Sequence, residues 1–176
     1  MKVIIKYTLF FCLIIIYSCS NSASIRKSNS SFLAYYNTFY AAEKSYKDAI
    51  EIIALDQSTN NVIPSSAVTL LDQAIENALI IEQQFYNTKY LDDAYFILAR
   101  SSYMIDRITA AKYYFNKLCQ EFPESTFFDE STIWMGYIDL KIGNVDQAKK
   151  KLLLFNSVND EDKFLLYLLG AEIAKF

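Results

Sequence analysis

An internal repeat limits what this chain can fold into more than any other feature of its sequence. A shift of 37 residues aligns residues 84–94 with residues 121–131 without a gap, and almost every aligned pair is identical or similar in kind. The match continues further on, where Leu98 falls over Met135. Self-similarity at a period of about 20 to 50 residues is typical of proteins built from stacked, equivalent units. We therefore expect a repeat architecture.

Residues 108–121 have the periodicity of an amphipathic helix. Pro123 ends the pattern, because a proline lacks the amide proton and clashes with the preceding turn. With only 3 Gly and 2 Pro in 176 residues, the chain has few helix breakers, and we predict an all-α fold. The predicted apolar face consists of Ala111, Tyr114, Phe115, Leu118 and Phe122, opposite Lys112, Asn116, Lys117, Gln120 and Glu121.

The same patterns predict about seven helices, paired as antiparallel hairpins that stack into a solenoid. Small residues at equivalent positions, namely Ala99, Gly136, Ala111 and Ala148, are expected where paired helices approach closely. In the first helix, the buried candidates are Tyr40, Ala41, Ala42, Tyr46, Ala49 and Ile53. The predicted helices are residues 32–55, 67–84, 89–105, 108–121, 127–141, 145–156 and 161–176.

Acidic residues recur where two of these helices begin. Asp92 and Asp129 are expected to cap free N–H groups and to meet the positive end of the helix dipole. The alternative is that Asp92-Asp93 and Asp129-Glu130 are paired carboxylates for acid–base or metal chemistry. Their periodic return at a helix start favours capping.

The repeat unit resembles the tetratricopeptide repeat. The residues that match its spacing are Tyr95, Leu98, Ala99, Ala111, Phe115 and Pro123, together with the turn at residues 143–148. Ser102 and Thr132 depart from the pattern, and the 37-residue period exceeds the usual length of about 34. The longer turn between units resembles the tetratricopeptide lipoproteins of the BamD-like outer-membrane assembly group. The resemblance implies a short right-handed solenoid.

In that family, partners bind in a groove lined by the first helix of each hairpin. Carried onto this chain, the groove positions include Asp93, Met104, Glu130, Ile133 and Leu140. Aromatic and basic side chains at such positions suit a peptide or helix from a protein partner. The alternative is ordinary packing between repeats. The residues that we single out for the groove are Phe96, Arg100, Tyr103, Tyr137 and Lys141.

The first residues read as a targeting segment. Lys2 and Lys6 precede an apolar stretch at residues 7–17, which is too short to span a bilayer and fits a signal peptide over residues 1–18. The sequence Ile16-Tyr17-Ser18-Cys19 resembles the lipobox of bacterial lipoproteins, although Tyr17 is larger than usual at its position. This resemblance implies that Cys19 is lipidated, with palmitate-type acyl chains. An ordinary signal peptide, or a signal anchor with an incidental cysteine, is the alternative.

Residues 19–31 are rich in Ser and Asn and predict a flexible tether ahead of a helical domain over residues 32–176. Ser20 after the lipobox cysteine resembles lipoproteins sent to the outer membrane, so we expect a lipid-anchored protein of the bacterial envelope facing the periplasm.

The composition favours a scaffold over an enzyme. The chain has no His and no nucleophile or phosphate-loop motif, and Cys119 is left without an activating base. No basic cluster for nucleic acid is present, and we expect no cofactor. The spacing Asp56-x-Ser58-x-Asn60 resembles a calcium loop but lacks its glycine and final glutamate, so we expect no metal. The alternative functions are an accessory or substrate-binding lipoprotein for an envelope enzyme, as in peptidoglycan turnover, and a solute-binding lipoprotein.

The end of the sequence predicts an unfinished unit. Leu169-Gly170 repeats Met135-Gly136 after 34 residues, so a fourth unit would stop before its second helix. Much of the circumference of residues 161–176 is apolar. We expect that the chain is the N-terminal piece of a longer repeat protein, or that this helix docks on a partner or on a second copy.

Overall fold

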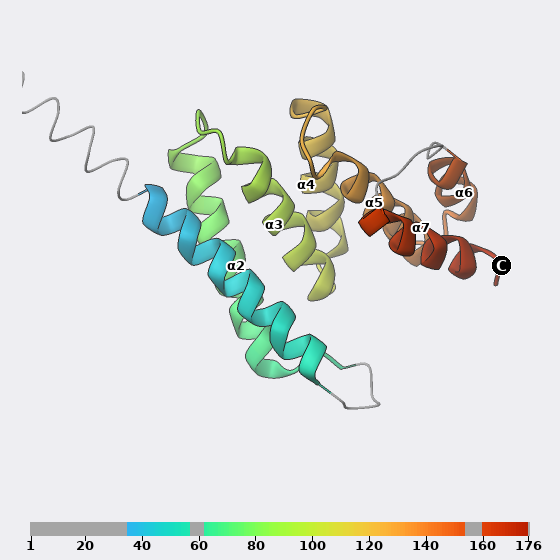
Figure 1. The fold of residues 1–176 in the computed structure, drawn as a ribbon, viewed down its shortest axis with the longest axis horizontal. Coiled ribbons are helices and arrows are strands. Elements are labelled where there is room, and N and C mark those ends of the chain that lie inside the picture. The colour runs from blue at the N-terminus through green and yellow to red at the C-terminus, as the bar shows by residue number, and fades with distance from the viewer. Residues whose placement is uncertain (1–34, 57–61, 154–159, 176) are drawn as a thin grey trace, which may run out of the picture. The chain divides into compact units, whose positions relative to one another are not determined.

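All regular structure in the described residues is helical (Figure 1). The computed structural model describes residues 35–56, 62–153 and 160–175. The described residues from Thr38 onward form one compact unit. The all-α prediction is confirmed. The helices are residues 35–55 (the first helix), α2 (Ser65–Gln84), α3 (Leu91–Met104), α4 (Ile108–Glu121), α5 (Phe128–Lys141), α6 (Val145–Leu153) and α7 (Asp160–Ile173).

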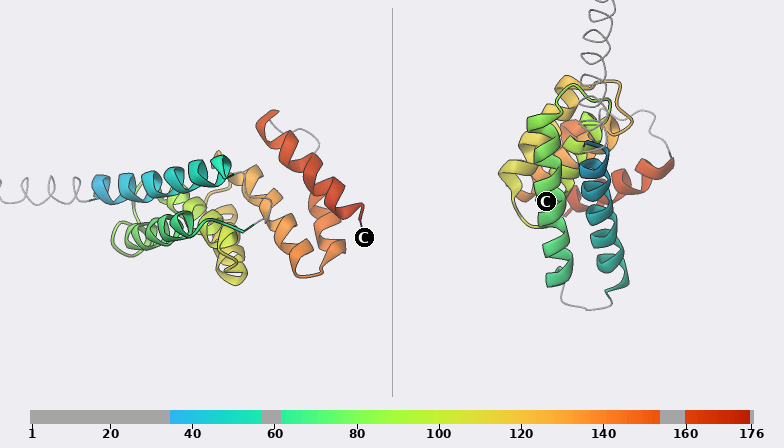
Figure 2. Two further views of the ribbon diagram at one scale, coloured as in Figure 1. Left: turned by 90° about the horizontal axis from the view of Figure 1, so that it is seen from below. Right: turned by 90° about the vertical axis from the view of Figure 1, so that its left-hand side faces the viewer.

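Helices that follow one another in the chain pack side by side. From α2 to α6 each helix contacts the next, and α7 returns against both α5 and α6. The first helix runs antiparallel to α2 (Figure 2), and Ala49 packs there against Ala67 and Leu71. This is the arrangement of stacked helical hairpins that the repeat predicts.

Small residues allow the close helix contacts, as predicted. Ala99, Ala111 and Ala148 are fully buried. A Cβ added to Gly136 of α5 would lie 2.7 Å from Leu169 Cδ2 of α7. Such a distance is well inside van der Waals contact, so α7 approaches α5 this closely because residue 136 has no side chain.

Tyr40 was predicted to be buried in the first helix, and this prediction is wrong. Its side chain is 55% exposed, whereas Ala42 and Ala49 are fully buried. Residues 42 and 49 lie seven apart and therefore share one face of the helix, which packs against α2. Residue 40 is rotated by about 200° from residue 42, because each residue turns the helix by about 100°. Its position therefore faces away from α2.

The predicted caps at Asp92 and Asp129 are also wrong. The cap positions are Tyr90 for α3 and Phe127 for α5, and neither side chain makes a capping hydrogen bond. Asp92 and Asp129 lie within the first turn, where a negative charge still meets the positive end of the helix. The Asp92 carboxylate instead accepts a hydrogen bond of 2.8 Å from Ser125 Oγ, which ties α3 to the segment before α5.

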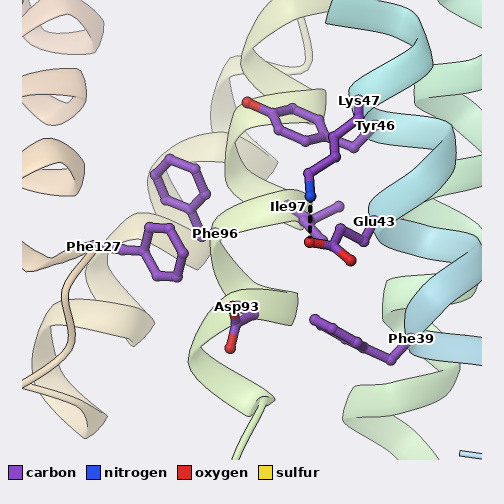
Figure 3. Close-up of a pocket in the computed structure, with 8 residues that line it drawn as sticks. All are labelled: Phe39, Glu43, Tyr46, Lys47, Asp93, Phe96, Ile97 and Phe127. Carbon is purple, nitrogen blue, oxygen red and sulfur yellow. Dashed lines mark hydrogen bonds and ion pairs between the residues drawn. The ribbon is translucent and has the colours of Figure 1, made fainter. Parts of the chain in front are cut away.

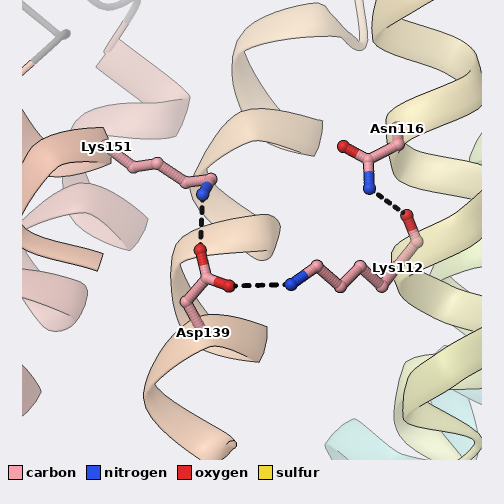
Figure 4. A network of polar contacts seen from close by, with 4 residues as sticks. All are labelled: Lys112, Asn116, Asp139 and Lys151. Atoms are coloured by element: carbon pink, nitrogen blue, oxygen red, sulfur yellow. Dashed lines mark hydrogen bonds and ion pairs between the residues drawn. The ribbon is translucent and has the colours of Figure 1, made fainter. Parts of the chain in front are cut away.

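A buried carboxylate joins three consecutive helices (Figure 4). Asp139 of α5, only 1% exposed, accepts a hydrogen bond of 3.1 Å from Lys112 Nζ of α4. Its other oxygen pairs with Lys151 of α6. Two cations thus compensate the charge of Asp139, which would otherwise be costly to bury.

The last helix packs on one face only. Leu169 and Ile173 of α7 are buried against Ile133 and Ala148. On the other face, Phe164, Tyr167 and Leu168 are 69%, 74% and 43% exposed. The predicted apolar face of this helix is therefore uncovered in the part of the chain that the structure describes. Phe176 lies outside the described residues.

Among the described helices, none combines the length and the apolar character needed to cross a bilayer.

Candidate partner-binding groove

Four of the five predicted groove residues gather around Trp134 of α5. The Arg100 guanidinium of α3 lies over the Trp134 ring, with Cζ 3.6 Å from the ring centroid. The Tyr103 ring lies 5.0 Å and the Tyr137 ring 5.1 Å from Trp134, centroid to centroid. Lys141 Nζ lies 5.5 Å from the Tyr103 ring centroid. We call Arg100, Tyr103, Trp134, Tyr137 and Lys141 the Trp134 cluster.

Arg100 is largely buried, and the carboxylate of Glu130 in α5 compensates its charge. Its side chain is 13% exposed, and Nε lies 3.8 Å from Glu130 Oε1. Trp134 Nε1 donates a hydrogen bond of 3.0 Å to the same oxygen of Glu130. Burial raises the pKa of Tyr46 of the first helix, and the nearby Arg100 partly opposes this rise. Arg100 of α3 therefore interacts both with Tyr46 of the first helix and with Glu130 of α5.

Tyr137 and Lys141 differ in what they leave available to a partner. Tyr137 Oη donates a hydrogen bond of 3.1 Å to the backbone oxygen of Leu165, so this side chain also holds α7 in place. Burial raises the pKa of the Tyr137 hydroxyl to about 12, so it stays protonated well above neutral pH. Lys141 is exposed and pairs with the exposed Asp106 at 2.7 Å. A partner reaching this end of the cluster meets Lys141 first.

Phe96 lies apart from the Trp134 cluster, in the wall of a pocket between the first helix and α3 (Figure 3). Its ring is buried and stacks on Phe127 at a centroid distance of 4.4 Å. The pocket has a volume of about 120 Å³. We call it the Asp93 pocket. Its lining residues are Phe39, Glu43, Tyr46, Lys47, Asp93, Phe96, Ile97 and Phe127.

Asp93 is the carboxylate in the wall of this pocket. Burial raises the pKa of Asp93 to about 6, and the negative charges of Asp92 and Glu43 contribute to the rise. Within the described residues, Asp93 forms no ion pair with a cation. The nearby Lys47 pairs instead with Glu43, at 2.6 Å. The pocket therefore combines aromatic walls with a carboxylate that lacks a countercharge.

Three other predicted groove positions belong to the core. Ile133 is fully buried beside Ala148 and Leu169, and Leu140 packs against that cluster. Met104 packs at the base of the first hairpin, near Ala49. Ile133 therefore offers no surface to a partner, whereas Leu140 and Met104 are partly buried by this packing.

Sequence reasoning missed Trp134 and the aromatic walls of the pocket. Trp134 could have been found, because it lies four residues after Glu130 and three before Tyr137, on the same side of α5. Phe127 could have been found from the repeat, since the 37-residue shift places it over the aromatic Tyr90. The contribution of Phe39 and Tyr46 was not visible, because the first hairpin lacks the clear repeat motif.

Two other candidate sites, the Cys119 thiol and the acidic side chains, can be compared with what a nucleophile or a metal centre needs. Cys119 is half-buried, and burial raises the pKa of its thiol, the opposite of what an activated nucleophile needs. In residues 35–56, 62–153 and 160–175, no three His, Cys, Asp or Glu side chains gather as metal ligands would. The predicted signal peptide, Cys19, the tether at residues 19–31 and most of the calcium-like loop lie outside the described residues.

Comparisons with known proteins identify one repeat. No curated protein and no solved structure matches the chain. The family profile described as Tetratricopeptide repeat matches residues 93–125, which begin in the first turn of α3 and end in the segment after α4. The hairpin that carries Asp93, Phe96, Arg100 and Tyr103 is therefore a tetratricopeptide repeat.

Proposed function

We propose that this chain is a non-catalytic scaffold of the bacterial cell envelope that binds a polypeptide along the first helices of its hairpins. Tetratricopeptide repeats commonly mediate protein interactions. The observation that carries the proposal is the surface formed by the Asp93 pocket and the Trp134 cluster, each of which includes residues of α3, the first helix of the tetratricopeptide repeat. Aromatic side chains and Arg are the residues that most often anchor protein partners.

The envelope location rests on the first residues of the sequence. A charged start, a short apolar stretch and Ile16-Tyr17-Ser18-Cys19 support secretion and lipidation at Cys19. More than one acyl chain is needed for stable anchoring, because each buried methylene contributes only about 0.8 kcal/mol. Ser20 and the likeness to BamD-like lipoproteins support an outer-membrane position facing the periplasm and a role in outer-membrane protein assembly.

The non-catalytic part of the proposal rests on the side chains that the chain offers. The sequence contains no His, and the thiol of Cys119 is held in its neutral form by burial. The carboxylate of Asp139 is already engaged by two lysines and is closed to solvent.

The anchor can be tested at Cys19 in cells that express the full chain. Cys19→Ser should abolish labelling by radioactive palmitate and release the protein from the membrane fraction. Continued labelling of this variant would contradict lipidation at Cys19.

The scaffold function can be tested with two matched double variants. Tyr103→Ala with Lys141→Glu alters the Trp134 cluster, whereas Tyr113→Ala with Lys149→Glu makes the same changes at exposed positions of α4 and α6. After crosslinking in intact cells, we expect proteins that co-purify with wild type and the control to be lost with the groove variant. Circular dichroism should be the same for all three. Equal retention of the same proteins by both variants would contradict the proposed surface.

A further inference from the structure

The two repeat units that carry the groove differ in one electrostatic respect. The 37-residue shift places Asp93 of α3 over Glu130 of α5. Glu130 faces a cation from the preceding hairpin, since Arg100 Nε lies 3.8 Å from its carboxylate. The Asp93 carboxylate instead faces the Asp93 pocket, and within the described residues no cation pairs with it.

The pocket has the shape and walls that suit a long basic side chain. The pocket has a volume of about 120 Å³, and the rings of Phe39, Phe96 and Phe127 line it. The aliphatic stem of Lys or Arg can pack on such rings while its charged end reaches a polar group. Aromatic faces also attract a nearby cation.

The charges around the pocket favour a cation over an anion. Asp92 of α3 and Glu43 of the first helix both add negative charge near Asp93, and Lys47 of the first helix is engaged by Glu43 at 2.6 Å. Phe127, which closes the pocket from the side of α5, brings no charge. An incoming acidic side chain would meet uncompensated carboxylates.

We propose that the Asp93 pocket receives a lysine or arginine side chain of the polypeptide that binds along the groove. The bound cation then lies in front of Asp93 as Arg100 lies in front of Glu130. This inference rests on the proposed function and specifies its partner: a segment with a basic residue flanked by apolar ones. The partner would thus supply to Asp93 the countercharge that Glu130 receives from Arg100 of this chain.

The proposal implies that binding weakens in acid. With a pKa of about 6, the Asp93 carboxyl is charged above pH 6 and becomes neutral below it. A bound cation stabilises the charged form, so binding is tightest above about pH 6 and weakens as the pH falls through that value. Asp92, Glu43 and Lys47 are the charged groups that face Asp93 and shape this response.

The test uses two acetylated and amidated probe peptides, Ala-Leu-Lys-Leu-Ala and the same peptide with norleucine in place of lysine. Norleucine keeps the length of the apolar stem and removes the ammonium group. Their dissociation constants for the full chain in detergent are measured by titration calorimetry at about pH 7.5 and about pH 5. Three proteins are compared: wild type, Asp93→Asn and Asp146→Asn, the last removing an exposed carboxylate of α6.

For wild type and Asp146→Asn at the higher pH, we expect the lysine peptide to bind at least about fivefold more tightly, as a partly buried ion pair of about 1 kcal/mol gives. The preference should disappear in Asp93→Asn and shrink at the lower pH. Equal affinity for the two peptides, undetectable binding of both, or an unchanged preference in Asp93→Asn would overturn the proposal. If the matched groove variants still separate partner proteins in cells, only the pocket assignment fails and the scaffold function stands.

Discussion

At the scale of single residues, Asp93 is a side chain whose charge opposes folding. Burial, Asp92 and Glu43 raise its pKa from 3.8 to about 6, so the folded protein binds a proton more readily than the unfolded chain between these values. The contribution of Asp93 to stability is therefore greatest below about pH 4 and is lost as the pH rises through 6. A carboxylate kept in a groove at this cost is typical of a binding residue.

We expect Asp93→Asn to be more stable than wild type at about pH 8, by about 1 kcal/mol after allowing for solvent screening of this half-buried group. The gain should shrink as the pH falls below 6 and vanish near pH 4. Urea unfolding at several pH values measures it. A gain that stays the same across this range would contradict the environment described for Asp93.

Ala111 tests the register of the repeat. Its side chain is fully buried, so Ala111→Phe should overpack α4 and destabilise the protein by about 1–3 kcal/mol. Thr109→Phe adds the same ring at an exposed position of the same helix and should change stability much less. Thermal melts compare the two. If both variants melt like wild type, residue 111 is not at a close helix contact.

The sequence predicted small buried residues well and polar contacts poorly. Ala99, Ala111 and Gly136 were identified because close helix contacts leave a periodic pattern of small side chains. The hydrogen bond from Ser125 to Asp92, which replaces a helix cap, joins residues 33 positions apart and leaves no periodic trace. The helical spacing places Trp134 beside Glu130 and Tyr137, but its contact with Arg100 depends on how α3 and α5 pack and leaves no such trace.

At the scale of helices, Asp139 holds α4, α5 and α6 together. Asp139→Asn removes the charge that compensates Lys112 and Lys151, and we expect a loss of about 1–3 kcal/mol, because both lysines keep some contact with water. Asp106→Asn, at an exposed ion pair with Lys141, should cost less than about 0.5 kcal/mol. Denaturant unfolding of both variants checks this. Equal losses would show that the buried pairing adds nothing.

The helices themselves were predictable because their apolar periodicity is strong and their ends are marked. Residues 108–121 were predicted with the observed bounds, since Pro123 follows the last turn of α4. The starts of α3 and α5 were each placed one or two residues too early, because the turns before them contain aromatic residues that extend the apolar pattern. The pocket could not be predicted, since it depends on how the first helix lies against α3.

At the scale of the whole molecule, the uncovered face of α7 is the clearest surface beyond the groove. Phe164 and Tyr167 are exposed, whereas Leu169 is buried. We expect wild type to bind a hydrophobic dye and Phe164→Ser with Tyr167→Ser to bind much less of it, with unchanged circular dichroism. Equal dye fluorescence would show that this face is covered in solution. Self-association through α7 remains a prediction, which light scattering on the full chain tests.

Photocrosslinking from defined positions tests the binding surface most directly. A benzophenone amino acid placed at residue 103, in the Trp134 cluster, should form light-dependent adducts with a polypeptide in intact cells. The same group at residue 113, exposed on α4, should not form those adducts. Adducts that arise from residue 103 and disappear with Lys141→Glu are the predicted result. Adducts from residue 113 alone, or the same adducts from both positions, would contradict a partner-binding groove on the first helices.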